Sequence, residues 1–201
     1  MTPTRSLKSI AESGLLVLVV GPSGVGKDTL LDGARRVLAD DQRFVFARRE
    51  ITRPATAGGE DHIEVDEATF ADREASGSYA LSWRANGLAY GVPAGVTRDL
   101  ALGRTVVVDG SRAIVGDVRS RFGTIRVILV DADRQNLARR LAARGRETAA
   151  EIDARLQRAP DFDLTGGDVV VVRNDGTPAE GISALVVALR DQSPPTDAVA
   201  V

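Results

Sequence analysis

Apolar residues along the chain gather in short, continuous runs that are separated by helix-forming stretches. The runs at 15–20, 105–108, 127–130 and 169–172 are almost entirely apolar, which is typical of parallel strands whose two faces are both covered by helices. Strands and helices alternate along most of the chain. This pattern predicts an α/β fold with a parallel sheet flanked by helices.

The same pattern gives the expected order of the elements. We expect strands at 15–20, 44–49, 79–83, 87–91, 104–109, 125–130 and 168–172. We expect helices at 28–39, 67–75, 93–102, 112–121, 133–144, 148–158 and 178–190. Between 60 and 91 the strands are shorter and less apolar, and they interrupt the repeat. We therefore expect a small substrate-binding lobe over about 52–91.

Length and composition limit the class of protein. A chain of 201 residues is long enough for one α/β domain, which we place at 14–192, with flexible tails at 1–13 and 193–201. The 26 basic and 28 acidic residues give a net charge of −2, which offers no general attraction to nucleic acid or to an anionic membrane. No apolar segment approaches the roughly 20 residues of a membrane helix. We expect a cytoplasmic protein with a small-molecule substrate, and its oligomeric state stays open.

The absence of cysteine excludes other chemistry. Without cysteine the chain has no disulfides, no thiolate metal sites and no cysteine nucleophile. His62 is the only histidine, so a histidine-based metal cluster is excluded and no nucleophilic triad is credible. His62 either contacts substrate or caps a turn.

A glycine-rich loop joins the first strand to the first helix, and its sequence is Gly21-Pro22-Ser23-Gly24-Val25-Gly26-Lys27. Backbone N–H groups of such a loop point inward, and the following helix N-terminus adds about half a positive charge. Lys27 can reach the β- and γ-phosphates of a nucleotide. The loop therefore predicts a P-loop that binds ATP, and the alternative is a glycine-rich turn without a ligand.

Two acidic residues are candidate Mg²⁺ ligands. Asp28 stands where P-loops usually carry a hydroxyl residue for the metal, and Thr29 follows one position later. A carboxylate is a harder oxygen ligand, so Mg²⁺ binding at Asp28 is plausible. Asp109 ends an apolar strand at the carboxyl edge of the expected sheet, where a second metal-organising carboxylate belongs. The alternative for Asp109 is a solvated residue at a strand end.

Arginines form two further groups. Arg49 and Arg53 lie near a strand end, and the guanidinium of Arg53 is a candidate clamp for a phosphorylated acceptor. Arg140, Arg144 and Arg155 are candidates for a lid over the triphosphate, because positioned positive charge is the main requirement of phosphoryl transfer. The alternatives are a solvated basic loop and a salt-bridged surface hairpin.

Aromatic residues are few, and two of them lie near the candidate acceptor site. A single tryptophan usually anchors packing, so we expect Trp83 in the core. The alternative is that Trp83 and Tyr90 close the pocket.

The chain resembles guanylate kinases over nearly its whole length. The motifs that carry this resemblance are, in order, the P-loop, Ile51-Thr52-Arg53, Tyr90-Gly91, Asp109 and the stretch from Arg140 to Thr148. The resemblance implies a guanylate kinase-like P-loop fold with a helical lid over about 139–158. It implies that Arg144 and Arg155 are lid arginines. It also implies acceptor-phosphate contacts at Arg53, Tyr90 and about His62, and a position near the adenine for Asn174.

Departures from that family point to a different acceptor. Ser82 and Ser111 stand where guanylate kinases read guanine with carboxylates, and a hydroxyl cannot replace a charged acceptor. The motifs Gly-Pro-Ser-Gly-x-Gly-Lys-Asp, Ile-Thr-Arg-Pro, Gly-Gly-Glu-Asp-His and Tyr-Gly-Val-Pro are similar to those of ribose 1,5-bisphosphate phosphokinases of phosphonate catabolism. That resemblance implies transfer of the ATP γ-phosphoryl group to ribose 1,5-bisphosphate, which yields 5-phosphoribosyl 1-diphosphate.

A sugar bisphosphate also suits the candidate residues. It has no base to read, and its hydroxyls are suitable partners for Ser82, Ser111, Glu60 and His62. Two other functions stay open. One is a guanylate or other nucleoside monophosphate kinase, and the other is a non-catalytic binding module with a guanylate kinase-like fold.

Overall fold

A computed structural model describes residues 14–57, 60–143, 148, 151–154 and 164–191. The chain divides into two compact units. Unit 1 comprises Met1–Val17, Asp41–Val108 and Gly116–Ile125, and unit 2 comprises Leu18–Asp40, Asp109–Val115 and Arg126–Val201. The expected tails at 1–13 and 193–201 lie outside the described residues.

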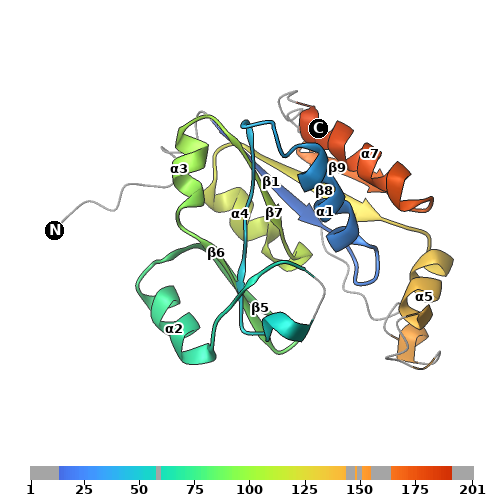
Figure 1. Cartoon of the computed structure of the whole chain (residues 1–201), viewed down its shortest axis with the longest axis horizontal. Helices are drawn as coiled ribbons and strands as arrows, with labels where there is room; N and C mark the ends of the chain where they lie inside the picture. The colour runs from blue at the N-terminus through green and yellow to red at the C-terminus, as the bar shows by residue number, and fades with distance from the viewer. Residues whose placement is uncertain (1–13, 58–59, 144–147, 149–150, 155–163, 192–201) are drawn as a thin grey trace. The chain divides into compact units, whose positions relative to one another are not determined.

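The larger sheet has five strands in the order β2-β7-β1-β8-β9. Its strands are β1 (Leu15–Val20), β2 (Phe44–Phe46), β7 (Thr105–Asp109), β8 (Ile125–Asp131) and β9 (Val169–Arg173). β2 pairs in parallel with β7, β8 pairs in parallel with β9, and every residue of β1 is buried. The prediction of a parallel sheet flanked by helices is confirmed (Figure 1).

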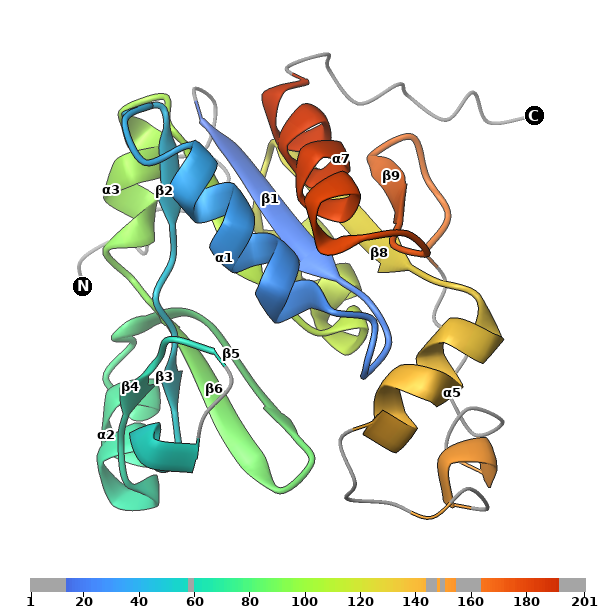
Figure 2. The ribbon, with the colours of Figure 1, turned by 45° about the vertical axis from the view of Figure 1, so that its right-hand side comes forward.

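Unit 2 contains the P-loop and the helices α1 (Lys27–Val37), α5 (Arg134–Ala143) and α7 (Pro178–Arg190), together with the 3-10 turn η3 (Arg112–Ile114). α1 and α7 lie side by side (Figure 2). A Cβ atom at Gly33 would lie 2.2 Å from Cδ1 of Ile182, so the two helices approach closely because that position has no side chain. The middle of α1, the helix that follows the P-loop, is thus packed against α7.

Unit 1 contains a second sheet, with the strand order β4-β3-β6-β5. Its strands are β3 (Glu50–Ile51), β4 (Ile63–Glu64), β5 (Tyr79–Ala85) and β6 (Leu88–Pro93). The unit also holds α2 (Glu67–Ala75), α3 (Val96–Ala101), most of α4 (Val115–Arg121) and the 3-10 turn η2 (Ala55–Ala57). Phe70 of α2 packs with Val65, Tyr79 and Ala89 in a buried cluster, so α2 covers one face of this sheet. The interruption at 60–91 that we expected from the sequence therefore folds as a compact sheet.

Several expected elements differ from the observed ones. The strand expected at 44–49 ends at Phe46, and the two-residue strands β3 and β4 were not predicted. Val171 is 54% exposed, because β9 is an edge strand rather than a strand buried on both faces. Of the helix expected at 148–158, residues 151–154 are helical, and most of the rest lies outside the described residues.

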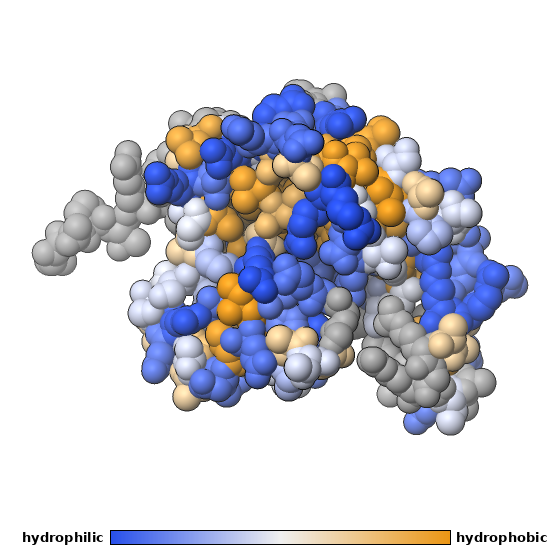
Figure 3. All heavy atoms as spheres, viewed as in Figure 1, coloured by the Kyte–Doolittle hydropathy of each residue, from blue (hydrophilic) through white to orange (hydrophobic). Residues whose placement is uncertain are grey.

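The surface carries few large apolar side chains. Val37, Leu102 and Val187 are each more than half exposed. Figure 3 shows hydrophilic residues over most of the visible face, with smaller apolar areas between them. Within the described part of the chain, none of the helices has the length and apolar character needed to cross a membrane.

A buried network in unit 1 gives a stability prediction. The hydroxyl of Tyr79 donates to Oε2 of Glu50 at 2.6 Å, and Arg73 forms an ion pair with the same carboxylate at 2.6 Å. Burial, and then the Glu50 carboxylate, raise the pKa of Tyr79. Tyr79→Phe leaves Glu50 with one partner fewer, so we expect the free energy of unfolding at pH 7 to fall by about 1 kcal/mol.

The pH dependence of that variant follows from the raised pKa. An unfolded chain loses the tyrosine proton near pH 10, whereas the folded protein keeps it, so the contribution of Tyr79 to stability is complete below about pH 10 and is lost above it. Urea unfolding at several pH values should show a smaller alkaline loss of stability in Tyr79→Phe. The control is Tyr90→Phe, because the Tyr90 hydroxyl makes no hydrogen bond within the described residues. An equal loss of stability in both variants would contradict the prediction.

Candidate active site

The P-loop conformation depends on two glycines. Gly24 and Gly26 have φ values of 87° and 93°, in the left-handed region that residues with a side chain rarely adopt. A Cβ atom at Gly26 would also lie 2.9 Å from Nδ2 of Asn174. The loop between β1 and α1 therefore has the glycine-dependent form that the sequence predicts for a phosphate-binding loop.

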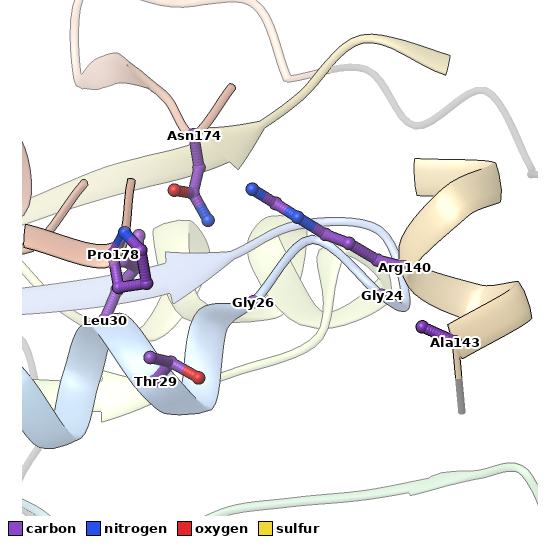
Figure 4. A pocket seen from close by; sticks show the side chains of 8 residues that line it. All are labelled: Gly24, Gly26, Thr29, Leu30, Arg140, Ala143, Asn174 and Pro178. Atoms are coloured by element: carbon purple, nitrogen blue, oxygen red, sulfur yellow. The ribbon is translucent and has the colours of Figure 1, made fainter. Parts of the chain in front are cut away.

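Two side chains from distant parts of the chain form hydrogen bonds with the same carbonyl group of the P-loop. Arg140 donates from Nη1 to the carbonyl oxygen of Val25 at 2.9 Å, and buried Asn174 donates from Nδ2 to the same oxygen at 2.7 Å. Figure 4 shows Arg140 extending from α5 across the loop toward Asn174. Sequence reasoning gave neither contact, because it placed Arg140 in a lid and Asn174 near a base.

A cavity of about 280 Å³ opens beside this part of the P-loop. Its volume is near the lower end of small-molecule sites. Among the described residues, Oδ1 of Asn174 is buried and lacks a hydrogen-bond partner, so it can accept from a ligand. The cavity is lined by Gly24, Gly26, Thr29, Leu30, Arg140, Ala143, Asn174 and Pro178 (Figure 4).

Lys27 and Asp109 form an ion pair beside the P-loop in unit 2. Nζ of Lys27 lies 3.2 Å from Oδ1 of Asp109, and their side chains are only 17% and 13% exposed. The sequence placed Asp109 at the strand end beside the P-loop, and the structure brings the two residues together there. The side chain of Asp28, in the first turn of α1, has no hydrogen-bond or ion-pair partner within the described residues.

The oxygen donors near the P-loop fit a Mg²⁺ ion that keeps other ligands. Asp28 and the exposed Thr29 supply a carboxylate and a hydroxyl at the start of α1. No group of three or more His, Asp or Glu side chains that could hold a metal ion occurs in the described ranges. Mg²⁺ in kinase sites commonly uses one or two carboxylates together with substrate phosphates and water, so this small donor set suits it.

Ser111 has a structural role in unit 2. Its hydroxyl oxygen accepts from the backbone N–H of Ala113 at 3.2 Å and caps η3. The preceding residue, Gly110, donates its N–H to the carbonyl of Val19 at 2.9 Å. The contact of Ser111 with substrate stays a prediction.

Unit 1 brings Arg49, Arg53 and Glu60 together. Nη2 of Arg49 donates to Oε2 of Glu60 in a short ion pair, and Nη2 of Arg53 lies 3.7 Å from Oε1 of the same carboxylate. The guanidinium of Arg49 also lies 5.3 Å from the ring centroid of Tyr90 and 5.7 Å from that of Trp83. Sequence reasoning selected these residues one by one and missed their ion pairs.

Trp83 is not in the core. It is half-buried and stacks on Tyr90, with ring centroids 5.3 Å apart and an interplanar angle of 4°. The two rings come from paired positions on β5 and β6. The expectation that the single tryptophan anchors the core is therefore wrong, and the aromatic pair instead supports Arg49.

His62 closes the loop that carries Arg53 and Glu60. Its ring is buried, with Nδ1 lying 3.0 Å from the carbonyl oxygen of Glu60 and Nε2 lying 3.0 Å from that of Arg53. Of the two alternatives for His62, the structure therefore favours capping of a turn over direct contact with substrate.

Ser82 lies on the opposite face of the sheet from Trp83 and Tyr90. Ser82 pairs with Gly91 on the neighbouring strand, so the two residues face the same side of the sheet. A Cβ atom added at Gly91 would lie 2.5 Å from the ring of Tyr79, which packs against Phe70 of α2. Ser82 therefore points to the face that α2 covers. Neighbouring residues of a strand point to opposite faces, so Ser82 cannot join Tyr90 around one ligand on the same face. The residue that shares the face of Trp83 is buried Leu81.

The contact between Asn174 and the P-loop gives a prediction about the donor site. Asn174→Ala removes one of the two donors to the carbonyl of Val25 and leaves that carbonyl less restrained. We expect KM for ATP to rise about tenfold, which equals about 1.4 kcal/mol, with KM for the acceptor unchanged. Steady-state kinetics with each substrate varied in turn measures both values, and Gln135→Ala, at an exposed position on α5, is the control. An increase in KM for the acceptor alone would contradict the assignment.

Comparison with known proteins shows the family of the chain. A family model described as an AAA domain matches residues 17–158. Ribose 1,5-bisphosphate phosphokinase PhnN of Brucella abortus is 44% identical over 178 residues, covering 89% of this chain and 93% of that protein. PhnN of Methylobacterium radiotolerans is 47% identical, covering 88% and 98%.

A solved structure shows the same fold. Guanylate kinase from Anaplasma phagocytophilum superposes with a TM-score of 0.59 at 18% identity, covering 89% of this chain and 85% of that one. The guanylate kinase-like fold and the resemblance to phosphokinases, both predicted from the motifs, are thereby confirmed. The chain belongs to the family that the AAA domain model describes and to the ribose 1,5-bisphosphate phosphokinases.

Proposed function

We propose that the protein transfers the γ-phosphoryl group of ATP to the 1-phosphate of ribose 1,5-bisphosphate, forming 5-phosphoribosyl 1-diphosphate and ADP. The observation that carries this proposal is the identity of 44–47% to phosphokinases of that name over about nine tenths of the chain. The P-loop with Lys27, and the arginines Arg49 and Arg53, supply the charges that such a reaction needs.

On the donor side, backbone N–H groups of the P-loop and the side chain of Lys27 hold the β- and γ-phosphates. The ammonium group of Lys27 has three N–H donors, so it can contact phosphate oxygens while it stays paired with Asp109. Asn174 and Arg140 fix the loop and border the cavity, which takes the nucleoside part of ATP. The planar guanidinium of Arg140 suits stacking on a base.

Asp28, Thr29 and Asp109 are the residues that would hold Mg²⁺. When bound, the ion would supply positive charge that offsets the negative charge of the donor phosphates. The exposed hydroxyl of Thr29 and the carboxylate of Asp28 are the chain's donors at the start of α1, while Asp109 orients Lys27 through their ion pair.

On the acceptor side, Arg53 orients the phosphate that attacks. Its guanidinium presents two parallel donors to a phosphate group, and Arg49 adds a second cation at the same place. No general base is required, because the attacking phosphate oxygen is already anionic. Arg144 and Arg155, which lie outside the described residues, are proposed to neutralise the transferring group when the lid closes.

The acceptor side offers little to a guanine base. A carboxylate that accepts from guanine N–H groups is replaced at one expected position by Ser111, whose oxygen already caps η3. At the other, Ser82 points to the opposite face of the sheet from Tyr90, and Leu81, on the face of Tyr90, is apolar and buried. Unpaired polar groups of a buried base would cost several kcal/mol, which corresponds to a discrimination of about 10³-fold or more.

Mass spectrometry of the products tests the proposal. The protein is incubated with Mg-ATP and either ribose 1,5-bisphosphate or GMP. We expect 5-phosphoribosyl 1-diphosphate from the first, and a kcat/KM for GMP that is lower by about 10³-fold. Efficient formation of GDP would instead identify a nucleoside monophosphate kinase. Absence of turnover with either acceptor, together with ATP binding, would support a binding module.

A further inference from the structure

The side chain of Glu60 lies where the two arginines of the acceptor site meet. Its Oε2 accepts from buried Arg49, and its Oε1 lies 3.7 Å from the more exposed Arg53. The side chains of Arg49, Glu60 and Arg53 are 7%, 17% and 25% exposed, so solvent reaches the group mainly from the side of Arg53. One internal carboxylate therefore occupies the centre of a site that has two cations.

A carboxylate and a phosphate group make the same kind of contact with arginine. Each presents a pair of oxygens to two parallel N–H donors of a guanidinium fork. The two carboxylate oxygens of Glu60 occupy the positions that two oxygens of a phosphate group would take if both arginines bound it. A phosphate group and the Glu60 carboxylate therefore compete for this place.

The internal anion has a physical reason in the absence of substrate. Arg49 is buried against the rings of Trp83 and Tyr90, and removing the anion from a buried ion pair costs several kcal/mol. Glu60 is an anion paired with Arg49. A phosphate dianion carries about twice the charge of a carboxylate, so it can replace Glu60 and leave both arginines better neutralised.

The loop that carries Glu60 is anchored by its backbone rather than by this side chain alone. His62 contacts the carbonyl oxygens of both Glu60 and Arg53, and its own carbonyl accepts from Arg48 at 3.3 Å. Neighbouring Asp61 pairs separately with Arg48 at 2.9 Å. The Glu60 carboxylate can thus leave the arginines through side-chain rotation while the loop keeps its position.

We propose that Glu60 is an internal stand-in for the acceptor phosphate, which holds Arg49 and Arg53 until that phosphate displaces it. Glu60 then acts as a specificity-determining residue, because only a group with more negative charge than a carboxylate replaces it. This inference rests on the proposed function for the identity of the acceptor, but the anion site itself is tested without that acceptor.

Titration of Glu60→Gln with inorganic phosphate tests the proposal. Trp83 is the only tryptophan of the chain and contacts Arg49, so its fluorescence reports anion binding at this site. Saturating Mg-ADP keeps phosphate out of the P-loop. Glutamine keeps the shape of Glu60 and removes its charge, so we expect the Kd for phosphate to fall about 5- to 10-fold.

Glu67→Gln is the matched control. Glu67 is an exposed carboxylate of the same unit, and it pairs with Arg84 at 3.0 Å, away from Arg49 and Arg53. We expect its Kd for phosphate to equal that of the unmodified protein. A general change in surface charge would lower both values equally and would overturn the proposal.

A rise in the Kd for phosphate in Glu60→Gln would instead indicate that Glu60 has a fixed positioning role. If Glu60 only orients the two arginines, Glu60→Gln weakens phosphate binding, and that result would overturn the stand-in role. In kinetics with ribose 1,5-bisphosphate we expect KM to fall several-fold and kcat to change less than twofold. If ribose 1,5-bisphosphate is not a substrate but Glu60→Gln still tightens phosphate binding, the proposed function fails and the inference stands.

Discussion

Lys27→Ala is expected to lower kcat for phosphoryl transfer by about 10³-fold or more, with ATP still bound weakly. Phosphoryl transfer leaves little covalent chemistry to the protein, so positioned charge supplies most of the catalysis. Lys27 follows the P-loop directly, and its ammonium group is oriented by Asp109 at 3.2 Å. Alanine removes this charge from the γ-phosphate during transfer.

The measurement is the initial rate of ADP formation with acceptor present, compared with that of Arg35→Ala. Arg35 is a partly exposed residue near the other end of α1 that lies 3.7 Å from Asp32, away from Lys27, so its loss should leave the rate unchanged. Thermal unfolding of Lys27→Ala should confirm that the fold persists. A rate within tenfold of the unmodified protein would contradict the role of Lys27.

Local sequence patterns predicted the donor side well. The P-loop follows from a fixed spacing of glycines and lysine, and Gly24 and Gly26 adopt the left-handed conformation that this spacing requires. The bounds of α2 and α7 match the expected ones, and in the structure each of these helices begins after a residue that caps its first turn, Asp66 or Thr177. Signals of this kind lie within a few residues of the feature that they predict.

The acceptor side depended on contacts that no local pattern contains. Glu60 meets Arg49 across eleven positions, through a loop whose closure by His62 involves backbone carbonyl groups. The strands β3 and β4 have two residues each, which is too short for an alternating pattern. Sequence reasoning therefore named the charged residues of this site without their partners.

One irregularity explains the position of Ser82. The pairing of β5 with β6 shifts between Tyr79 and Leu81, and after this shift Tyr79 and Ser82 point to the same face. A bulge of this kind reverses the faces of the residues that follow it. Simple alternation from Tyr79 would have placed Ser82 on the other face, and the sequence of β5 carries no glycine that marks the irregularity.

Arg53→Ala is expected to raise KM for the acceptor about 10²-fold while KM for ATP stays within twofold. Each hydrogen bond to a charged group contributes about 1.5 kcal/mol or more, and a guanidinium fork makes two of them with one phosphate. Their loss corresponds to about 3 kcal/mol, and a tenfold change corresponds to about 1.4 kcal/mol. Arg53 is chosen over Arg49 because it is the more exposed of the two and is held less closely by Glu60.

Two comparisons make this prediction specific. Arg53→Lys keeps the charge but loses the fork, so it should recover only part of the affinity, as expected for a point charge in place of two parallel donors. Arg43→Ala removes an exposed arginine of the same unit that pairs with Asp41 at 2.7 Å, and it should change neither KM. If Arg53→Lys restores full affinity, the contact is electrostatic attraction without bidentate geometry. If Arg43→Ala raises KM for the acceptor as much as Arg53→Ala does, the effect belongs to the charge of the unit and not to a phosphate clamp at Arg53.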